Sequence, residues 1–390
     1  MKILLLSFYY FPDLSAGSFR MKALVDSLIT KDPDINITII TTMPNRYDLY
    51  KISTNEHEIS KNVNIYRVPL PKHSSSIYGQ IISFWTFARY VLFKVKNQDY
   101  NLIFATSSRL MTAFLGALIS KKFKVPLYLD IRDLFSDSVS DVYNKKIPRL
   151  FLLIIKYIER WTFKTANSVN LVSKGFIEDA KRISKDTRYT IFTNGIDDIF
   201  LNKDYENKVT ISLPLTILYA GNIGEGQGLH KILPGLAKGI EGKAVIKVVG
   251  SGSSRAKLED QLFKQNVTNV ELIDPVSRKD LFSFYREADV LFLHLNDFDA
   301  FKKVLPSKFF EYAATEKYIL AGVGGYADTF FNDSIEGVKT FKPCDVDEAL
   351  HALNSFNFNK ININRSDFCS KYARSSIMNK MADDILGNNQ

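Results

Sequence analysis

Cysteine is scarce in this chain, because Cys344 and Cys369 are its two thiols among 390 residues. Two cysteines exclude a disulfide-stabilised scaffold and a multi-cysteine zinc ribbon, and we expect both to be idle thiols in a reducing compartment. The five histidines show no spacing typical of metal ligands, so we expect no metal.

Long apolar runs are also lacking. Residues 74–88 form an uncharged run of 15 residues that is partly polar, whereas a membrane-spanning helix needs about 20 apolar residues. The apolar start of the chain stops at Pro12 without a small-residue cleavage site, so we expect a buried first strand and no signal peptide.

What is present is an ordinary globular composition, with 46% hydrophobic and 24% charged residues. The net charge of +9 is unevenly divided, because residues 1–200 carry +10 and residues 201–390 carry −1. A basic first half suggests a polyanionic partner, such as a nucleic acid, an anionic membrane surface or a phosphorylated substrate.

Two segments of the basic half, 72–96 and 145–164, combine apolar stripes with aromatic residues and flanking Lys and Arg. Such helices can pack in a core and keep their charged ends at the surface, or they can lie in a bilayer interface. Each segment alone favours the core. Together, on the basic half, they predict a peripheral contact with an anionic membrane surface.

Short apolar runs alternate with helical patterns along the whole chain, which is typical of α/β proteins with doubly wound parallel sheets. The pattern breaks between residues 195 and 212 and then restarts. We therefore expect two α/β domains in tandem, with ligands bound at the loops that follow the strands. The predicted strands of the two halves are 2–8, 36–42, 63–68, 102–105, 127–131, 168–172 and 190–192, then 215–221, 244–249, 270–273, 290–294, 318–321 and 339–341.

Two loops of the first half carry unusual residues. The segment 9–20 opens a helix near Gly17, where backbone N–H groups can approach an anion; a plain turn with a serine cap is the alternative. The segment 130–138 places three carboxylates beside Arg132 at the end of an apolar strand. Charges at such a position favour a pairing or catalytic role, and a structural Arg–Asp pair is the alternative.

Three loops of the second half are candidates for phosphate and nucleotide binding. The segment 219–229 has four glycines in eight residues between a strand and a helix, which favours close approach of a ligand to the backbone. Gly250 and Gly252 follow the next strand, but Arg255 replaces the third glycine of a dinucleotide site. Lys308 and Glu311 share one face of a helix that Pro306 begins. The cation suits a diphosphate and the carboxylate a ribose diol, although a surface Lys–Glu pair is the alternative.

In order along nearly the whole chain, these segments resemble the family 4 glycosyltransferases of the GT-B fold, and most closely the WbuB-like branch of bacterial surface-polysaccharide enzymes. The resemblance implies two doubly wound Rossmann-like domains that face each other across a cleft. It implies an acceptor-binding domain at 1–198, joined by a C-terminal helix at about 367–390, and a donor-binding domain at 199–366. The matching segments are 9–12 with Gly17, 132–134, 194–197, 221–224 with 227–229, Gly250 with Gly252, 288–290, and 306–308 with Glu311 and Tyr312.

The same resemblance implies the roles of individual residues. Glu311 would bind the ribose hydroxyls, and Lys308 would hold the diphosphate together with the backbone of Asn222, Ile223 and Gly224. Gly17 would close over the donor from the other domain, and Arg132, Asp133 and Lys308 would be catalytic. The base would lie near Gly250, Val276 and Ser277, and the remaining donor-binding residues would be Gly252 and Ser307.

Three departures from the broader family are visible. Lys303 stands where many members have the first of two glutamates, and Arg132 stands where many have a histidine. Asn222 and Gln227 occupy the region of the usual Arg and Lys. The WbuB-like branch tends to share these changes, so we interpret them as traits of that branch.

The predicted function is retaining transfer of a sugar from a UDP-sugar to a lipid-diphosphate-linked glycan. The enzyme would be a hexosyl- or N-acetylhexosaminyl-transferase of lipopolysaccharide O-antigen or capsule synthesis. It would need no cofactor and no metal, and it would be cytoplasmic and peripheral on the inner face of the bacterial cytoplasmic membrane. We expect no nucleic-acid partner, because no recognition motif is present.

Other functions stay open. A GT-B sugar-nucleotide epimerase would share the donor site, and a non-catalytic sugar-nucleotide-binding subunit would fit the departures at Lys303 and Arg132. A metal-dependent GT-A transferase would use an Asp-x-Asp triplet, which occurs three times but is common by chance. A dehydrogenase is disfavoured by the missing third glycine.

Overall fold

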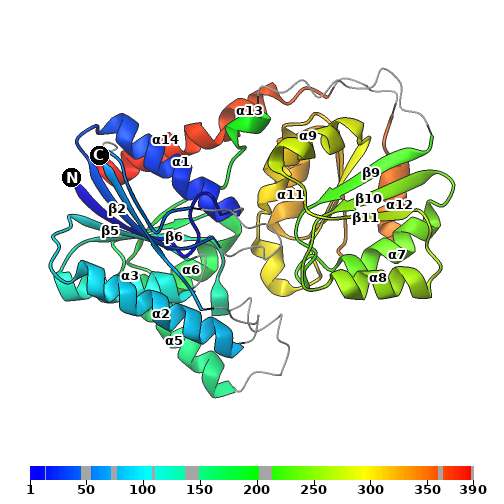
Figure 1. Cartoon of the computed structure of the whole chain (residues 1–390). Helices are drawn as coiled ribbons and strands as arrows, with labels where there is room; N and C mark the ends of the chain where they lie inside the picture. The colour runs from blue at the N-terminus through cyan, green and yellow to red at the C-terminus, as the bar shows by residue number, and fades with distance from the viewer. Residues whose placement is uncertain are drawn as a thin grey trace. The chain divides into compact units, whose positions relative to one another are not determined.

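The computed structural model describes residues 1–13, 15–44, 54–71, 77–107, 110–136, 149–201, 213–358 and 363–387. The chain forms two compact α/β units (Figure 1). Unit 1 comprises Met1–Asn194 and Arg374–Gln390, and unit 2 comprises Gly195–Ala373. The first boundary therefore lies four residues before the predicted one at 198, and the chain returns to unit 1 at residue 374 instead of about 367.

Unit 1 contains an eight-stranded sheet in the order β3-β4-β2-β1-β5-β6-β7-β8, in which β3 alone pairs in antiparallel fashion. The central strands are buried on both faces, as the continuous apolar runs predict. The edge strand β3 was not predicted, and β8 lies two residues before the predicted strand at 190–192. The strands are β1 (Lys2–Leu6), β2 (Asn36–Thr42), β3 (His57–Ile59), β4 (Val63–Val68), β5 (Leu102–Thr106), β6 (Leu127–Ile131), β7 (Ser168–Leu171) and β8 (Arg188–Thr190).

Helices cover both faces of this sheet. Figure 1 shows α1 and α14 on one face and α2, α3 and α5 on the other. No described helix is long and apolar enough to cross a membrane. The helices of unit 1 are α1 (Ala16–Lys31), α2 (Ile77–Val95), α3 (Leu110–Phe123), α5 (Arg149–Thr165), α6 (Ile177–Ile183) and α14 (Arg374–Leu386), with a 3-10 turn at Lys174–Phe176.

Unit 2 contains six parallel strands in the order β11-β10-β9-β12-β13-β14, and its apolar cores lie on both faces of the sheet. Because all six strands are parallel, their carboxyl ends lie at one edge. The strands are β9 (Leu215–Ala220), β10 (Ala244–Val249), β11 (Val270–Ile273), β12 (Val290–His294), β13 (Tyr318–Gly322) and β14 (Val338–Phe341). The helices are α7 (Leu229–Gly239), α8 (Arg255–Lys264), α9 (Arg278–Glu287), α10 (Ser307–Ala313), α11 (Tyr326–Ser334), α12 (Val346–Asn354) and α13 (Ser366–Tyr372), with 3-10 turns at Asp198–Phe200 and Asp299–Lys303.

The predicted return helix at 367–390 is two helices. Ala373 adopts φ −54° and ψ 132°, which ends α13, and it pairs with Ile196 in an isolated parallel bridge. The Ile196 N–H donates to the Tyr372 carbonyl at 2.7 Å. These backbone bonds keep α13 in unit 2, whereas α14 packs against α1 in unit 1.

Candidate functional site

Three separate motifs of unit 1 meet at the carboxyl edge of its sheet. A Cβ on Gly17, which follows β1, would lie 3.6 Å from the guanidinium of Arg132, which follows β6. Arg132 Nη2 donates to Asn194 Oδ1 at 3.2 Å, and the Arg132 backbone N–H donates to Ser107 Oγ at 2.9 Å. The structure thus brings the predicted residues Gly17 and Arg132 together with Asn194.

The Arg132 guanidinium has capacity for a further acceptor. Its Nη1 is buried and has no hydrogen-bond partner among the described residues. Burial lowers the pKa of the Arg132 guanidinium, and the neighbouring cations of Arg20 and Arg374 lower it further. The carboxylates of Asp130 and Asp133 oppose that shift. An anionic ligand would stabilise this cation.

Asp133, next along the chain, is exposed, so a substrate group can reach it. The protein around this carboxyl nevertheless desolvates it, and the desolvation raises its pKa to about 6. The Arg132 guanidinium opposes that shift. A carboxyl with a pKa near 6 can exchange a proton near neutral pH. Residues 137 and 138 of the same predicted loop lie outside the described residues.

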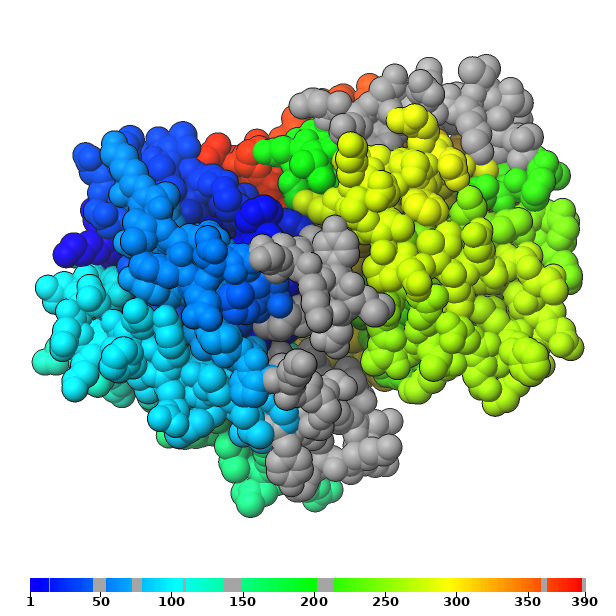
Figure 2. Space-filling view, in the orientation of Figure 1, coloured from blue at the N-terminus to red at the C-terminus, as the bar shows by residue number. Residues whose placement is uncertain are grey.

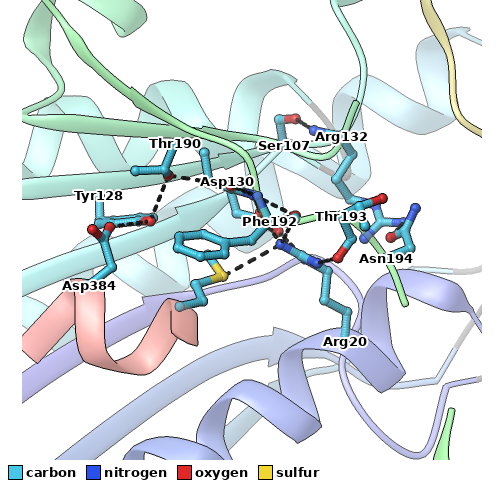
Figure 3. A network of polar contacts seen from close by, with 12 residues as sticks. Arg20, Ser107, Tyr128, Asp130, Arg132, Thr190, Phe192, Thr193, Asn194 and Asp384 are labelled. Atoms are coloured by element: carbon cyan, nitrogen blue, oxygen red, sulfur yellow. Dashed lines mark hydrogen bonds and ion pairs between the residues drawn. The ribbon is translucent and has the colours of Figure 1, made fainter. Parts of the chain in front are cut away.

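A buried polar network holds this edge in place (Figure 3). Arg20 of α1 is fully buried and binds both carboxylate oxygens of Asp130, at 3.0 Å from Nε and 2.9 Å from Nη2. Arg20 Nη2 also donates to the Phe192 carbonyl at 2.8 Å, and Asn170 Nδ2 donates to Asp130 Oδ1 at 2.7 Å. The network fixes the last strand residues before Arg132 and the backbone before Asn194.

In this network Asp130 has a structural role as the ion-pair partner of Arg20. The predicted alternative of a structural Arg–Asp pair therefore holds for Asp130, but its partner is Arg20 and not the nearby Arg132. Sequence reasoning missed Arg20 and Asn170. A signal was available for Arg20, because it lies on the apolar stripe of its helix with Met21 and Leu24, where an arginine needs a buried partner.

In unit 2, the loops after β9 and β10 are bound to each other through backbone atoms. The Ile223 N–H donates to the Ser251 carbonyl at 2.9 Å, and the Ser254 N–H donates to the Ile223 carbonyl at 2.9 Å. Gly250 has a φ of +150°, and a Cβ there would lie 1.9 Å from the Gly221 carbonyl oxygen. Gly252 is similar, with 2.5 Å from its Cβ to the Ile223 carbonyl oxygen. The close approach of the two loops thus requires both glycines.

The glycine-rich loop 221–228 is closed by one of its own side chains. Gln227 Oε1 accepts from Asn222 Nδ2 at 2.8 Å and from the Gly224 N–H at 3.2 Å. The predicted diphosphate donors Ile223 and Gly224 therefore both have protein acceptors in this conformation. A phosphate could use the Gly224 N–H once the Gln227 side chain rotates away.

His294, the last residue of β12, and Asn296, two residues further along, hold the same loop through hydrogen bonds to its carbonyl oxygens. Sequence reasoning did not assign them. His294 Nδ1 donates to the Gln227 carbonyl at 2.6 Å, and Nε2 accepts from the Cys344 N–H at 2.9 Å. Burial lowers the pKa of His294 to about 4, so the ring is neutral at pH 7. Asn296 Nδ2 donates to the Glu225 carbonyl at 2.9 Å. A polar pair at the end of a buried apolar strand is the sequence signal that could have identified them.

The helices α9 and α10 bring the remaining predicted donor residues to this edge. Lys308 and Glu311 form an ion pair of 2.7 Å, and Glu311 Oε2 also accepts from the Tyr285 hydroxyl at 3.2 Å. The Tyr312 hydroxyl oxygen accepts the Ala220 N–H at 3.1 Å and thereby ties α10 to the end of β9. Ser307 is the first residue of α10, Ser277 caps the start of α9, and Val276 packs against the apolar core.

A cavity of about 520 Å³ opens near the carboxyl ends of β12, β13 and β14. Asn296, Phe301, Gly324 and Phe341 are among its lining residues, and none of the predicted site residues lines it. In the described ranges, no group of three or more His, Cys, Asp or Glu side chains is arranged to hold a metal ion.

No protein-family profile and no curated protein sequence matches the chain. Solved structures do match over its whole length. Sucrose-phosphate synthase from Thermosynechococcus elongatus has a TM-score of 0.77 at 14% identity and covers 99% of this chain and 98% of its own. HepE from Anabaena, solved with UDP-glucose, has a TM-score of 0.69 at 13% identity and covers 100% of both chains.

A third structure, WaaG, a glycosyltransferase involved in lipopolysaccharide biosynthesis, has a TM-score of 0.68 at 16% identity and covers 99% of this chain and 100% of its own. At these identities the comparison establishes the fold. The predicted GT-B architecture, with two parallel-sheet Rossmann-like units, is confirmed. Membership of family 4 and of the WbuB-like branch stays a prediction.

Proposed function

We propose that this protein is a retaining, metal-independent glycosyltransferase that moves a sugar from a UDP-sugar to a lipid-diphosphate-linked glycan. The observation that carries the proposal is the gathering of the donor residues predicted in unit 2, from four separate loops, at one edge of its sheet. The GT-B fold supports it, because HepE has this fold and was solved with UDP-glucose. The acceptor class is consistent with WaaG, which is involved in lipopolysaccharide biosynthesis.

Glu311 is the proposed ligand of the ribose hydroxyls. The bonds from Lys308 and Tyr285 both go to its Oε2, so a ribose diol can donate to Oε1 and keep the ion pair intact. Tyr285 and Lys308 hold the carboxylate in one orientation, which reduces the entropic cost of binding a diol. The base would lie near Gly250, Val276 and Ser277.

Neutralisation of the leaving diphosphate is the proposed source of catalysis. As the bond between the anomeric carbon and the phosphate oxygen breaks, negative charge grows on the diphosphate, and preorganised cations stabilise it. Lys308 is the proposed cation of unit 2, and the Arg132 guanidinium, with its unpartnered Nη1, is that of unit 1. The leaving phosphate oxygen accepts the proton of the acceptor hydroxyl, and Asp133 is proposed to orient that hydroxyl.

The test is the affinity for UDP, measured by titration calorimetry with EDTA present. Glu311→Gln keeps the size of the side chain but weakens its acceptor strength, and Glu311→Ala removes it. We expect Glu311→Ala to weaken UDP binding by about 1–3 kcal/mol, the usual contribution of hydrogen bonds to a charged group. Glu311→Gln is expected to fall between the wild type and Glu311→Ala.

The matched control is Glu241→Ala. Glu241 is exposed and lies before β10, at the opposite edge of the same sheet, so its removal should leave UDP affinity unchanged. Equal UDP affinity of Glu311→Ala and the wild type would remove Glu311 from the donor site. Binding of NAD in place of UDP would favour the dehydrogenase, and a new sugar on a lipid-linked acceptor would separate transfer from epimerisation.

A further inference from the structure

The outer side of unit 1 has an apolar stripe that its own core does not use. Helix α5 packs Ile155 and Phe163 inward, yet Leu150, Leu153 and Tyr157 are 69%, 63% and 71% exposed. These three residues and the exposed Ile154 recur at spacings of three and four, so they lie along one face of the helix. A surface helix normally has a single apolar stripe, and a second, exposed one marks an interaction site.

Helix α2 repeats the arrangement. Phe87, Val91 and Val95 are buried, whereas Trp85 and Phe93 are 64% and 76% exposed, and Ile81, Ile82 and Leu92 are also exposed. The reading of this segment as a plain core helix therefore fails for Ile81, Trp85 and Phe93. Both α2 and α5 contact α3, and Figure 1 places all three on the same face of the sheet. Figure 2 shows the surface of α2 and α3 in blue to cyan at the lower left, with the blue-green end of α5 below it.

The charge of these three helices is almost entirely positive. They contain eight basic residues, and all of them except the half-buried Lys94 are exposed, among them Arg89 on α2 and Lys156 and Arg160 on α5. Their one carboxylate, Glu159, is buried and accepts the Phe135 N–H at 2.8 Å. The exposed apolar stripes are thus bordered by cations with no carboxylate on the same helices to pair with them.

We propose that the exposed stripes of α2 and α5 dock unit 1 on an anionic membrane surface. Aromatic and aliphatic side chains would enter the boundary between headgroups and acyl chains, and the bordering Lys and Arg would contact anionic headgroups. A second copy of the chain fits less well, because a two-fold contact would bring this basic surface against itself and bury like charges. The predicted parts 72–76 and 145–148 lie outside the described residues, and the proposal does not use them.

The chain offers its own reporter for the experiment. It has two tryptophans, Trp85 on the exposed stripe and Trp161, which packs edge-on against Phe114. In the variant Trp161→Phe, the remaining Trp85 emission should shift to the blue when vesicles of phosphatidylcholine with about 30% phosphatidylglycerol are added. Vesicles of phosphatidylcholine alone should give a clearly smaller shift, and added salt should reduce the shift with the anionic vesicles.

Vesicle sedimentation then tests the residues. The triple variant Leu150→Ser, Leu153→Ser, Tyr157→Ser and the variant Lys156→Gln, Arg160→Gln are each expected to lower the partition coefficient on anionic vesicles by about tenfold or more. The matched control is Phe263→Ser, because Phe263 is 83% exposed on α8 of unit 2. This control should bind vesicles as the wild type does, and all variants should keep wild-type UDP affinity, so the inference stands apart from the proposed function.

Three results would overturn the proposal. The first is the absence of any vesicle binding by the wild type, and the second is unchanged binding by the triple variant. The third is concentration-dependent dimerisation that the triple variant abolishes while vesicle binding is absent, which would assign the surface to a second copy of the chain.

Discussion

Each unit contains an almost fully buried arginine, at the carboxyl edge of the sheet in unit 1 and before β13 and β14, at the opposite edge, in unit 2. The two are satisfied in different ways. Arg20 of unit 1 is paired with the carboxylate of Asp130 at 2.9 Å. Arg365 of unit 2, 2% exposed, donates instead to carbonyl oxygens, including those of Glu336 and Lys317 at 2.8 Å. Burial lowers the pKa of Arg365 to about 10, against the opposing effects of Cys369, Glu316 and Glu336.

The difference extends to the sites themselves. The edge of unit 1 is held by side chains that are far apart in sequence, Arg20 and Asp130 (Figure 3), together with Asn170. The edge of unit 2 is held largely through backbone contacts between glycine loops and through His294, a neutral ring. Unit 1 should therefore be most sensitive to the loss of a charge, and unit 2 to the addition of a Cβ or a proton.

The largest effect is expected for Asp130→Ala. It leaves the Arg20 guanidinium buried without its carboxylate, and breaking one partner of a buried pair typically costs about 3–5 kcal/mol. Urea unfolding would measure the loss, and hydrogen exchange of α1 and β6 amides would assign it to unit 1. Asp26→Ala is the matched control on α1, because Asp26 pairs with Lys22 at the surface and should cost less than about 1 kcal/mol. Equal costs for the two variants would contradict the structural part of Asp130.

Gly250→Ala tests the backbone design of unit 2. The new Cβ would meet the Gly221 carbonyl oxygen at 1.9 Å, so the loops after β9 and β10 must separate, at a cost of about 3 kcal/mol from strain and lost bonds. The control Gly242→Ala separates backbone strain from steric contact, because Gly242 has a φ of +73° but no atom within 4 Å of its added Cβ. This control should cost about 1 kcal/mol. A Gly250→Ala variant as stable as Gly242→Ala would show that the loops do not need their close contact.

Sequence patterns predicted the parts of this structure that depend on local order. Continuous apolar runs located the central strands. The rule that parallel strands end at one edge brought Gly17 near Arg132, and helical spacing brought Lys308 near Glu311. The missed features depend on partners distant in sequence. Arg20 and Asp130 are 110 residues apart, Ala373 ends α13 where it pairs with Ile196, and β3 is a three-residue edge strand with little apolar pattern.

The smallest of the three stability effects is expected from the pH dependence of His294. Its pKa of about 4 in the folded protein lies below the ordinary value of 6.5, because burial disfavours the charged ring and outweighs the Gln227 carbonyl, which favours it, and the Lys231 cation adds to the lowering. The unfolded chain therefore binds a proton first as the pH falls. The stability contributed by the neutral ring is complete above pH 6.5 and declines between pH 6.5 and pH 4.

At about 1.4 kcal/mol per pH unit, this loss reaches about 2 kcal/mol between pH 6.5 and pH 5. His294→Gln can keep one donor and one acceptor but cannot titrate, so its unfolding free energy should fall less steeply over this range. His351→Gln, at an exposed helix position, should keep the wild-type slope. The difference between the two variants then isolates the contribution of the buried ring from that of all other titrating groups. If both variants have the same slope, the tie between Gln227 and Cys344 does not depend on the protonation state of His294, and the expected sensitivity of the unit 2 edge to an added proton loses its support at this residue.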